Sequence, residues 1–81
     1  MENFRPIPEH YQWQHLLEPY GRIALGNVVG NKIDDIRAYI ERLPNGEWYY
    51  HIHFTQFKGG EPSAQLAKEK VMNILDHLKY S

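Results

Sequence analysis

The sequence predicts an α+β domain in which a three-stranded antiparallel sheet carries two helices on one face, in the order α-β-β-β-α. Three observations favour this fold: helically spaced apolar residues near the start, two alternating segments joined by a Pro-Asn-Gly turn, and a long amphipathic segment at the end. A chain of 81 residues is expected to form a single domain, with residues 1–8 as an irregular, proline-containing arm.

The segment after the arm carries apolar residues at helical spacing, namely Trp13, Leu16, Leu17 and Tyr20. This spacing predicts a short helix over residues 9–17, which Pro19 ends. A strand is predicted next over residues 22–29, with a bend or bulge at Gly26 and Asn27 and a turn at Gly30 and Asn31.

The middle of the chain predicts a β-hairpin. Apolar and polar residues alternate over residues 36–41 and again over residues 48–55. The Pro-Asn-Gly segment between them suits a three-residue loop that pairs Leu43 with Glu47. On the apolar face, this register pairs Ile40 with Tyr50, Ala38 with Ile52 and Ile36 with Phe54.

The last part of the chain predicts a helix over residues 63–79. The Lys-Gly-Gly-Glu-Pro segment at residues 58–62 is interpreted as the preceding loop, and Ser63 as the N-cap. Apolar residues at three- and four-residue spacing form a stripe that is expected to face the sheet. They are Ala64, Ala67, Val71, Ile74, Leu75 and Leu78.

Composition excludes several classes of protein. Nine Lys and Arg against ten Asp and Glu give a formal net charge of −1, without the basic surplus of proteins that bind nucleic acid through phosphate charge. Because there is no cysteine, disulfides and cysteine-ligated metals are excluded. No apolar run approaches the roughly 20 residues of a membrane-spanning helix, and the first residues lack the pattern of a signal peptide. We therefore expect a cytoplasmic protein that binds no membrane.

The polar face of the hairpin is the main candidate site. Tyr and Arg are enriched in the hot spots of protein interfaces, so this face is predicted to bind a protein partner or a second copy of the chain. The alternative is a half-solvated strand surface, where tyrosine is favoured without any binding role. The side chains concerned are Arg37, Tyr39, Tyr49, His51 and His53.

Metal binding and catalysis have little support. His51 and His53 project from the same face of one strand, but His10, His15 and His77 lie on helices expected to cover the other face. No metal site and no cofactor are therefore predicted. The chain also lacks a cysteine nucleophile and a glycine-rich phosphate loop, so no catalytic residue is assigned and the protein is predicted not to be an enzyme.

One short segment supports a resemblance to a known family. The last helix begins Ser-Ala-Gln-Leu-Ala-Lys at residues 63–68, and the whole chain has the predicted order α-β-β-β-α. In these respects it resembles the double-stranded-RNA-binding domain, whose last helix opens with Ser-Lys-Lys-x-Ala-Lys. Two of the three lysines are Ala64 and Gln65 here, and the family's Gly-Pro-x-His loop reads Gly-Asn-Lys at residues 30–32. The resemblance implies RNA binding with most of the phosphate clamp lost; the lysines left for it are Lys32, Lys58, Lys68 and Lys70.

These observations predict a non-enzymatic binding module. Small, cysteine-free, near-neutral domains are similar to accessory proteins of phages and mobile elements, which bind and inhibit or modulate a protein partner. The alternative function is RNA binding, either by a degenerate duplex-RNA-binding domain or by single strands that stack on the tyrosine and histidine rings of the hairpin. No sequence-specific reading of DNA is expected.

Overall fold

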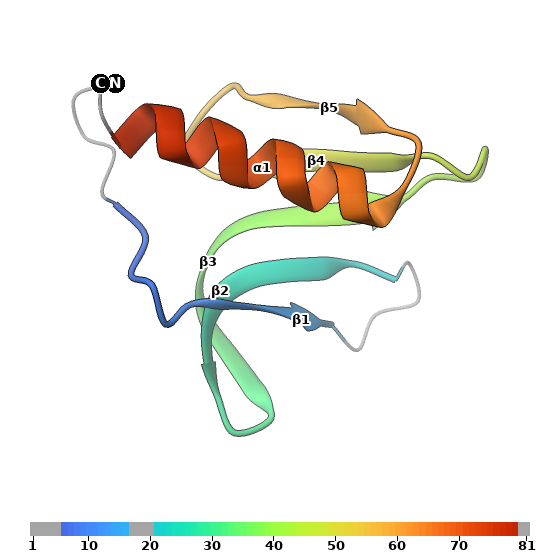
Figure 1. Ribbon diagram of the computed structural model, residues 1–81. Helices are drawn as coiled ribbons and strands as arrows, with labels where there is room; N and C mark the ends of the chain where they lie inside the picture. Colours follow the sequence, from blue (N-terminus) through green and yellow to red (C-terminus); the bar gives the residue numbers. More distant parts are fainter. Residues whose placement is uncertain (1–5, 17–20, 80–81) are drawn as a thin grey trace.

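The computed structural model describes residues 6–16 and 21–79 of the chain. Within these ranges, the strands form one antiparallel sheet in chain order, and α1 lies across one face of it, over β3, β4 and β5 (Figure 1). The elements are β1 (Gln12–His15), β2 (Ile23–Val29), β3 (Lys32–Arg42), β4 (Trp48–Ile52), β5 (Lys58–Glu61) and α1 (Ala64–Lys79).

The predicted three-stranded sheet with two helices is wrong, because the sheet has five strands and the described residues contain one helix. The first predicted helix is replaced by β1, in which Trp13 pairs with Leu25 of β2. Tyr11 and Trp13 alternate with two glutamines, and this period of two suits a strand, where aromatic residues are favoured. The end of the predicted helix falls on residues 17–20, outside the described residues.

The segment interpreted as a loop at residues 58–62 contains the other unpredicted strand, β5. Its four residues include two glycines and no apolar side chain, so no strand pattern is visible there. β5 forms because it pairs with β4, and the Ile52 N–H continues this pairing by donating to the Phe57 carbonyl at 3.1 Å. Gly59 lies opposite Tyr50, and a Cβ at this glycine would come 2.8 Å from the Tyr50 hydroxyl.

The β3–β4 hairpin has the predicted register. Ala38 pairs with Ile52 and Ile40 pairs with Tyr50, and all four side chains are buried. Gly46 in the connecting loop has φ 91°, the left-handed conformation that the predicted loop requires. The hairpin therefore has one face in the core, as its alternation predicts.

The irregularity predicted at Gly26 and Asn27 coincides with a change of register, but the extra residues lie in β3 and not in the predicted strand. Leu25 pairs with Ala38 but Asn27 pairs with Asp34, so the register between β2 and β3 changes at this glycine. A Cβ at Gly26 would come 2.7 Å from the Asp34 backbone oxygen, so no larger residue fits without displacing β3. Beyond the register change, the ends of β2 and β3 extend away from α1 (Figure 1).

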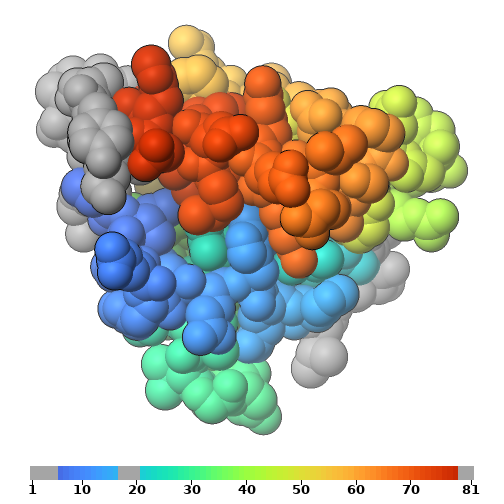
Figure 2. Space-filling view, viewed as in Figure 1, coloured from blue at the N-terminus to red at the C-terminus, as the bar shows by residue number. Residues whose placement is uncertain are grey.

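The helix predicted at the end of the chain is confirmed as α1, and it covers the core. The Ser63 hydroxyl accepts a hydrogen bond from the Leu66 N–H at 3.2 Å, which confirms the N-cap. Seen from this side, α1 lies beside the blue residues 6–16, which include β1 (Figure 2). The buried core cluster consists of Ile23, Leu25, Ala38, Ile40, Tyr50, Ile52, Ala67, Val71 and Leu75.

The two glycines of β5 provide a test of this packing. We expect Gly59→Ala to lower the free energy of unfolding by about 1–3 kcal/mol, because the added methyl group displaces the Tyr50 ring. Gly60→Ala is the matched control, since its Cβ meets nothing nearer than the Glu47 carboxylate at 3.8 Å. Its stability should be unchanged or higher by up to about 1 kcal/mol. Urea unfolding measures both, and equal stability of the two variants would contradict the contact between Tyr50 and Gly59.

Candidate functional site

Four of the five residues predicted to bind a partner lie together on the sheet face opposite α1. The centre of the Tyr39 ring is 6.1 Å from that of Tyr49, 6.0 Å from that of His51 and 5.7 Å from that of His53. We call these four residues the aromatic face. Each is half-buried, and Tyr39, Tyr49 and His51 alternate along their strands with the residues that α1 covers.

Arg37, the fifth predicted residue, is buried, with 8% of its surface exposed. Its Nε donates to the Asp35 carboxylate at 3.2 Å, and its guanidinium lies 5.9 Å from the centre of the Tyr11 ring. The Tyr11 hydroxyl donates to the same carboxylate at 2.6 Å. Asp35 and Arg37 both belong to the stretch of β3 opposite Gly26, where the register with β2 changes. Arg37 and Asp35 therefore connect the N-terminal segment to β3.

Arg22, which is not among the predicted site residues, places a cation beside the aromatic face. Its guanidinium carbon lies 4.9 Å from the centre of the Tyr39 ring. Its Nε also donates to the Glu41 carboxylate at 3.1 Å. A single arginine at the start of a strand forms no motif, and only the pairing of β2 with β3 brings it beside Tyr39.

Both histidines of the aromatic face bond to backbone carbonyls. His51 Nε2 lies 3.2 Å from the Thr55 oxygen, and His53 Nδ1 lies 3.0 Å from the Ile36 oxygen. Because a carbonyl oxygen only accepts, each of these ring nitrogens carries the donated proton. In the part of the chain that the structure describes, no group of three or more histidine, aspartate or glutamate residues is placed to hold a metal ion.

Phe54 is the exposed aromatic residue that sequence analysis misplaced. The alternation predicts that Phe54 pairs with Ile36 on the apolar face, but β4 ends at Ile52 and Phe54 is 86% exposed. Its φ of 63° lies in the left-handed region, which is rare for a bulky residue. The Phe54 ring centre lies 6.1 Å from that of His53, so Phe54 extends the aromatic face at one end.

A short hydrogen-bonded turn holds Phe54 in this position. The Thr55 hydroxyl donates to the Ile52 carbonyl at 2.7 Å and accepts from the Phe57 N–H at 3.0 Å. Phe57 is also exposed, and the surface around the turn is hollowed over about 600 Å³. The residues that line this hollow are Phe54, Thr55, Gln56, Phe57 and Leu78.

The four lysines predicted to bind RNA do not form one surface. Lys58 pairs with His51 and so lies on the side of the aromatic face. Lys32 lies at the tip of the β2–β3 hairpin, and Lys68 and Lys70 lie on α1. Lys68 Nζ is 5.8 Å from the centre of the Trp13 ring. The α-β-β-β-α order that carried the resemblance to the double-stranded-RNA-binding domain is also absent from the described residues.

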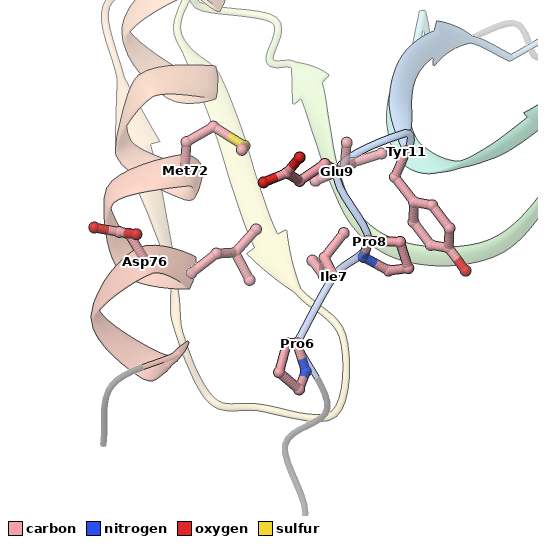
Figure 3. Close-up of a pocket in the computed structure, with 9 residues that line it drawn as sticks. Pro6, Ile7, Pro8, Glu9, Tyr11, Met72 and Asp76 are labelled. Carbon is pink, nitrogen blue, oxygen red and sulfur yellow. The ribbon is translucent and has the colours of Figure 1, made fainter.

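A separate groove of about 280 Å³ lies between residues 6–11 and α1. Its walls are mostly apolar, and Figure 3 shows the Glu9 carboxylate directed into the groove while that of Asp76 points away. Small-molecule sites combine apolar walls with several converging polar groups. One exposed carboxylate does not supply such a set, so we do not assign a ligand to this groove.

Comparisons of the chain with protein-family models, curated proteins and solved structures find no match. Among the described residues, no helix combines the length and the apolar character needed to cross a membrane. The functional argument therefore depends on the geometry of the aromatic face.

The environment of Tyr39 predicts a pH dependence of stability. Burial raises the pKa of the Tyr39 hydroxyl above its usual value of 10.0, the neighbouring Tyr49 hydroxyl and Glu41 carboxylate add to this rise, and Arg22 opposes it. The folded state favours the protonated phenol. The free energy of unfolding is therefore highest below about pH 10 and falls as the pH rises through the raised pKa of Tyr39. We expect Tyr39→Phe to lose less stability than the wild type above pH 10, as measured by thermal unfolding at increasing pH. Parallel loss in both proteins would contradict this environment.

Proposed function

We propose that the protein is a non-enzymatic binding module that contacts a partner protein through the aromatic face and the adjoining Phe54 turn. The observation that carries the proposal is the Phe54 side chain, which is 86% exposed in a left-handed conformation beside the aromatic face. Strained backbone of this kind costs on the order of 1–3 kcal/mol and is concentrated at sites of ligand contact. An exposed phenylalanine held at such a cost fits a residue that a partner buries.

The chemistry of the surrounding surface supports a protein partner. Tyr39 lies near the centre of the aromatic face, and tyrosine and arginine are the residue types that dominate interface hot spots. Arg22, Glu41 and Lys58 bring charges of both signs to its margins. An aromatic centre with a rim of mixed charge is typical of protein interfaces.

Single-stranded RNA is the second candidate, and the distribution of charge disfavours it. Stacked bases need cations nearby that follow the phosphate backbone. On the aromatic face, the Arg22 guanidinium is paired with the Glu41 carboxylate. Of the four lysines assigned to RNA, only Lys58 lies on this side of the sheet.

The proposal is tested by retention of a partner from a nuclease-treated lysate on the immobilised protein. We expect Tyr39→Ser and Phe54→Ser each to reduce the retained partner at least about tenfold, as truncation of an interface hot spot does. Leu66→Ser is the matched control, because Leu66 is an exposed apolar residue on α1. It should retain as much partner as the wild type.

Circular dichroism of each variant separates loss of binding from loss of folding. Loss of all bound material on nuclease treatment would assign RNA as the ligand instead. Equal retention by the wild type, Tyr39→Ser and Phe54→Ser would remove the aromatic face from the function.

A further inference from the structure

Within the described residues, β5 is a margin of the sheet. β4 pairs with one side of it, and no other described element lies beyond it (Figure 1). The Ile52 N–H donates to the Phe57 carbonyl, and this bond fixes the alternation of hydrogen bonding along β5. The backbone N–H and C=O groups of Lys58 and Gly60 therefore point away from β4. The two N–H and two C=O groups of these residues can therefore form hydrogen bonds with an additional strand.

The described residues do not require glycine at position 60. Its φ lies outside the left-handed region, and a Cβ there would meet the nearest atom, a Glu47 carboxylate oxygen, at 3.8 Å. Gly59 differs, because the Tyr50 ring occupies the position of its Cβ. Gly60 pairs with Tyr49, so its missing side chain leaves an open position on the same side of the sheet as the aromatic face. This position lies beside Tyr49 and the Glu47 carboxylate.

Arg22 indicates which side chain suits that position. Its guanidinium lies against the Tyr39 ring and bonds to the Glu41 carboxylate. Tyr49 and Glu47 provide a second ring and carboxylate on the β5 side of the hairpin, next to the open position at Gly60. A planar guanidinium both stacks on aromatic rings and pairs with carboxylates, which an ammonium group does less well.

We infer that β5 accepts an extended segment of the partner protein as an additional antiparallel strand, with an arginine of that segment over Gly60, between Tyr49 and Glu47. This inference rests on the proposed function, because the added strand would extend the aromatic face. Lys58 lies two residues from Gly60 on the same side of β5, so it faces the residue two positions after the arginine. An acidic residue is favoured there. The recognised sequence is thus Arg-x-Asp or Arg-x-Glu in an extended conformation.

Backbone and side chains have separate roles in this recognition. The N–H and C=O groups of Lys58 and Gly60 bond to the added strand whatever its sequence, which supplies affinity. The charges of Glu47 and Lys58 lie at different points along the edge and fix the register of the segment. Antiparallel addition continues the pattern of the whole sheet.

The test uses the isotope-labelled full chain and the probe peptide acetyl-Thr-Arg-Val-Asp-Thr-Val-amide, followed by nuclear magnetic resonance. We expect saturable binding with a Kd of about 1 mM or tighter, amide shifts centred on Tyr49, Lys58 and Gly60, and slower hydrogen exchange at the Lys58 and Gly60 amides. A matched peptide with glutamine in place of arginine should bind at least about fivefold more weakly.

Variants of the protein test the two parts of the proposed arginine site. Gly60→Val covers the open position with a side chain that strands favour, and Glu47→Gln removes the carboxylate. Each should weaken binding of the arginine peptide at least about fivefold. Glu69→Gln, at an exposed position on α1, is the matched control and should bind as the wild type does. Urea unfolding confirms that each variant is folded.

The inference is overturned if the arginine peptide binds with a Kd weaker than about 1 mM, if the shifts lie on other elements, or if the glutamine peptide binds equally well. Shifts at these amides with oligouridylate, but not with the peptide, would assign the edge to RNA and also overturn it. If Gly60→Val retains the lysate partner fully while Tyr39→Ser and Phe54→Ser lose it, the inference about β5 fails and the proposed function stands.

Discussion

The alternation of side chains along the β3–β4 hairpin is the constraint on which the rest of the structure depends. Ala38, Ile40 and Ile52 fill the core beneath α1, and because successive strand residues point to opposite faces, Tyr39 and His51 must lie on the other side. A slip of one residue in the register would bring the imidazoles under α1 and the isoleucines into solvent. The packing of the core therefore also determines the surface that we propose for binding.

The hairpin, the irregularity at Gly26 and α1 could be predicted because each has a long periodic pattern or specific turn chemistry. β1 and β5 could not, since a strand of four residues carries too little periodicity to distinguish it from a helix or a loop. β5 depends on a contact between elements, the Tyr50 ring over Gly59, that no local pattern reveals. The predicted topology failed at these two short segments.

Residues of the candidate site were predicted correctly where apolar and polar side chains alternate regularly along the hairpin strands. Outside this regular alternation, the positions predicted for Arg37 and Phe54 were wrong. Tyr39, Tyr49 and His51 follow directly from the register. Arg37 is one of the three β3 residues opposite Gly26, where the register with β2 changes, and Phe54 lies just beyond the end of β4, so regular strand pairing on both sides determines neither position. Bulges and tight turns redirect side chains in this way. The most exposed aromatic residue of the site was therefore assigned to the core.

The central claim is that the aromatic face is open in the isolated protein and covered in its complex. Photochemically induced dynamic nuclear polarisation reports which tyrosine and histidine rings a dissolved flavin can reach. In the free protein we expect polarised signals from Tyr39 and Tyr49 and none from buried Tyr50. Saturation with the retained partner should abolish the first two signals, while exposed His77 on α1 keeps its own. Unchanged Tyr39 and Tyr49 signals in the saturated complex would contradict the account.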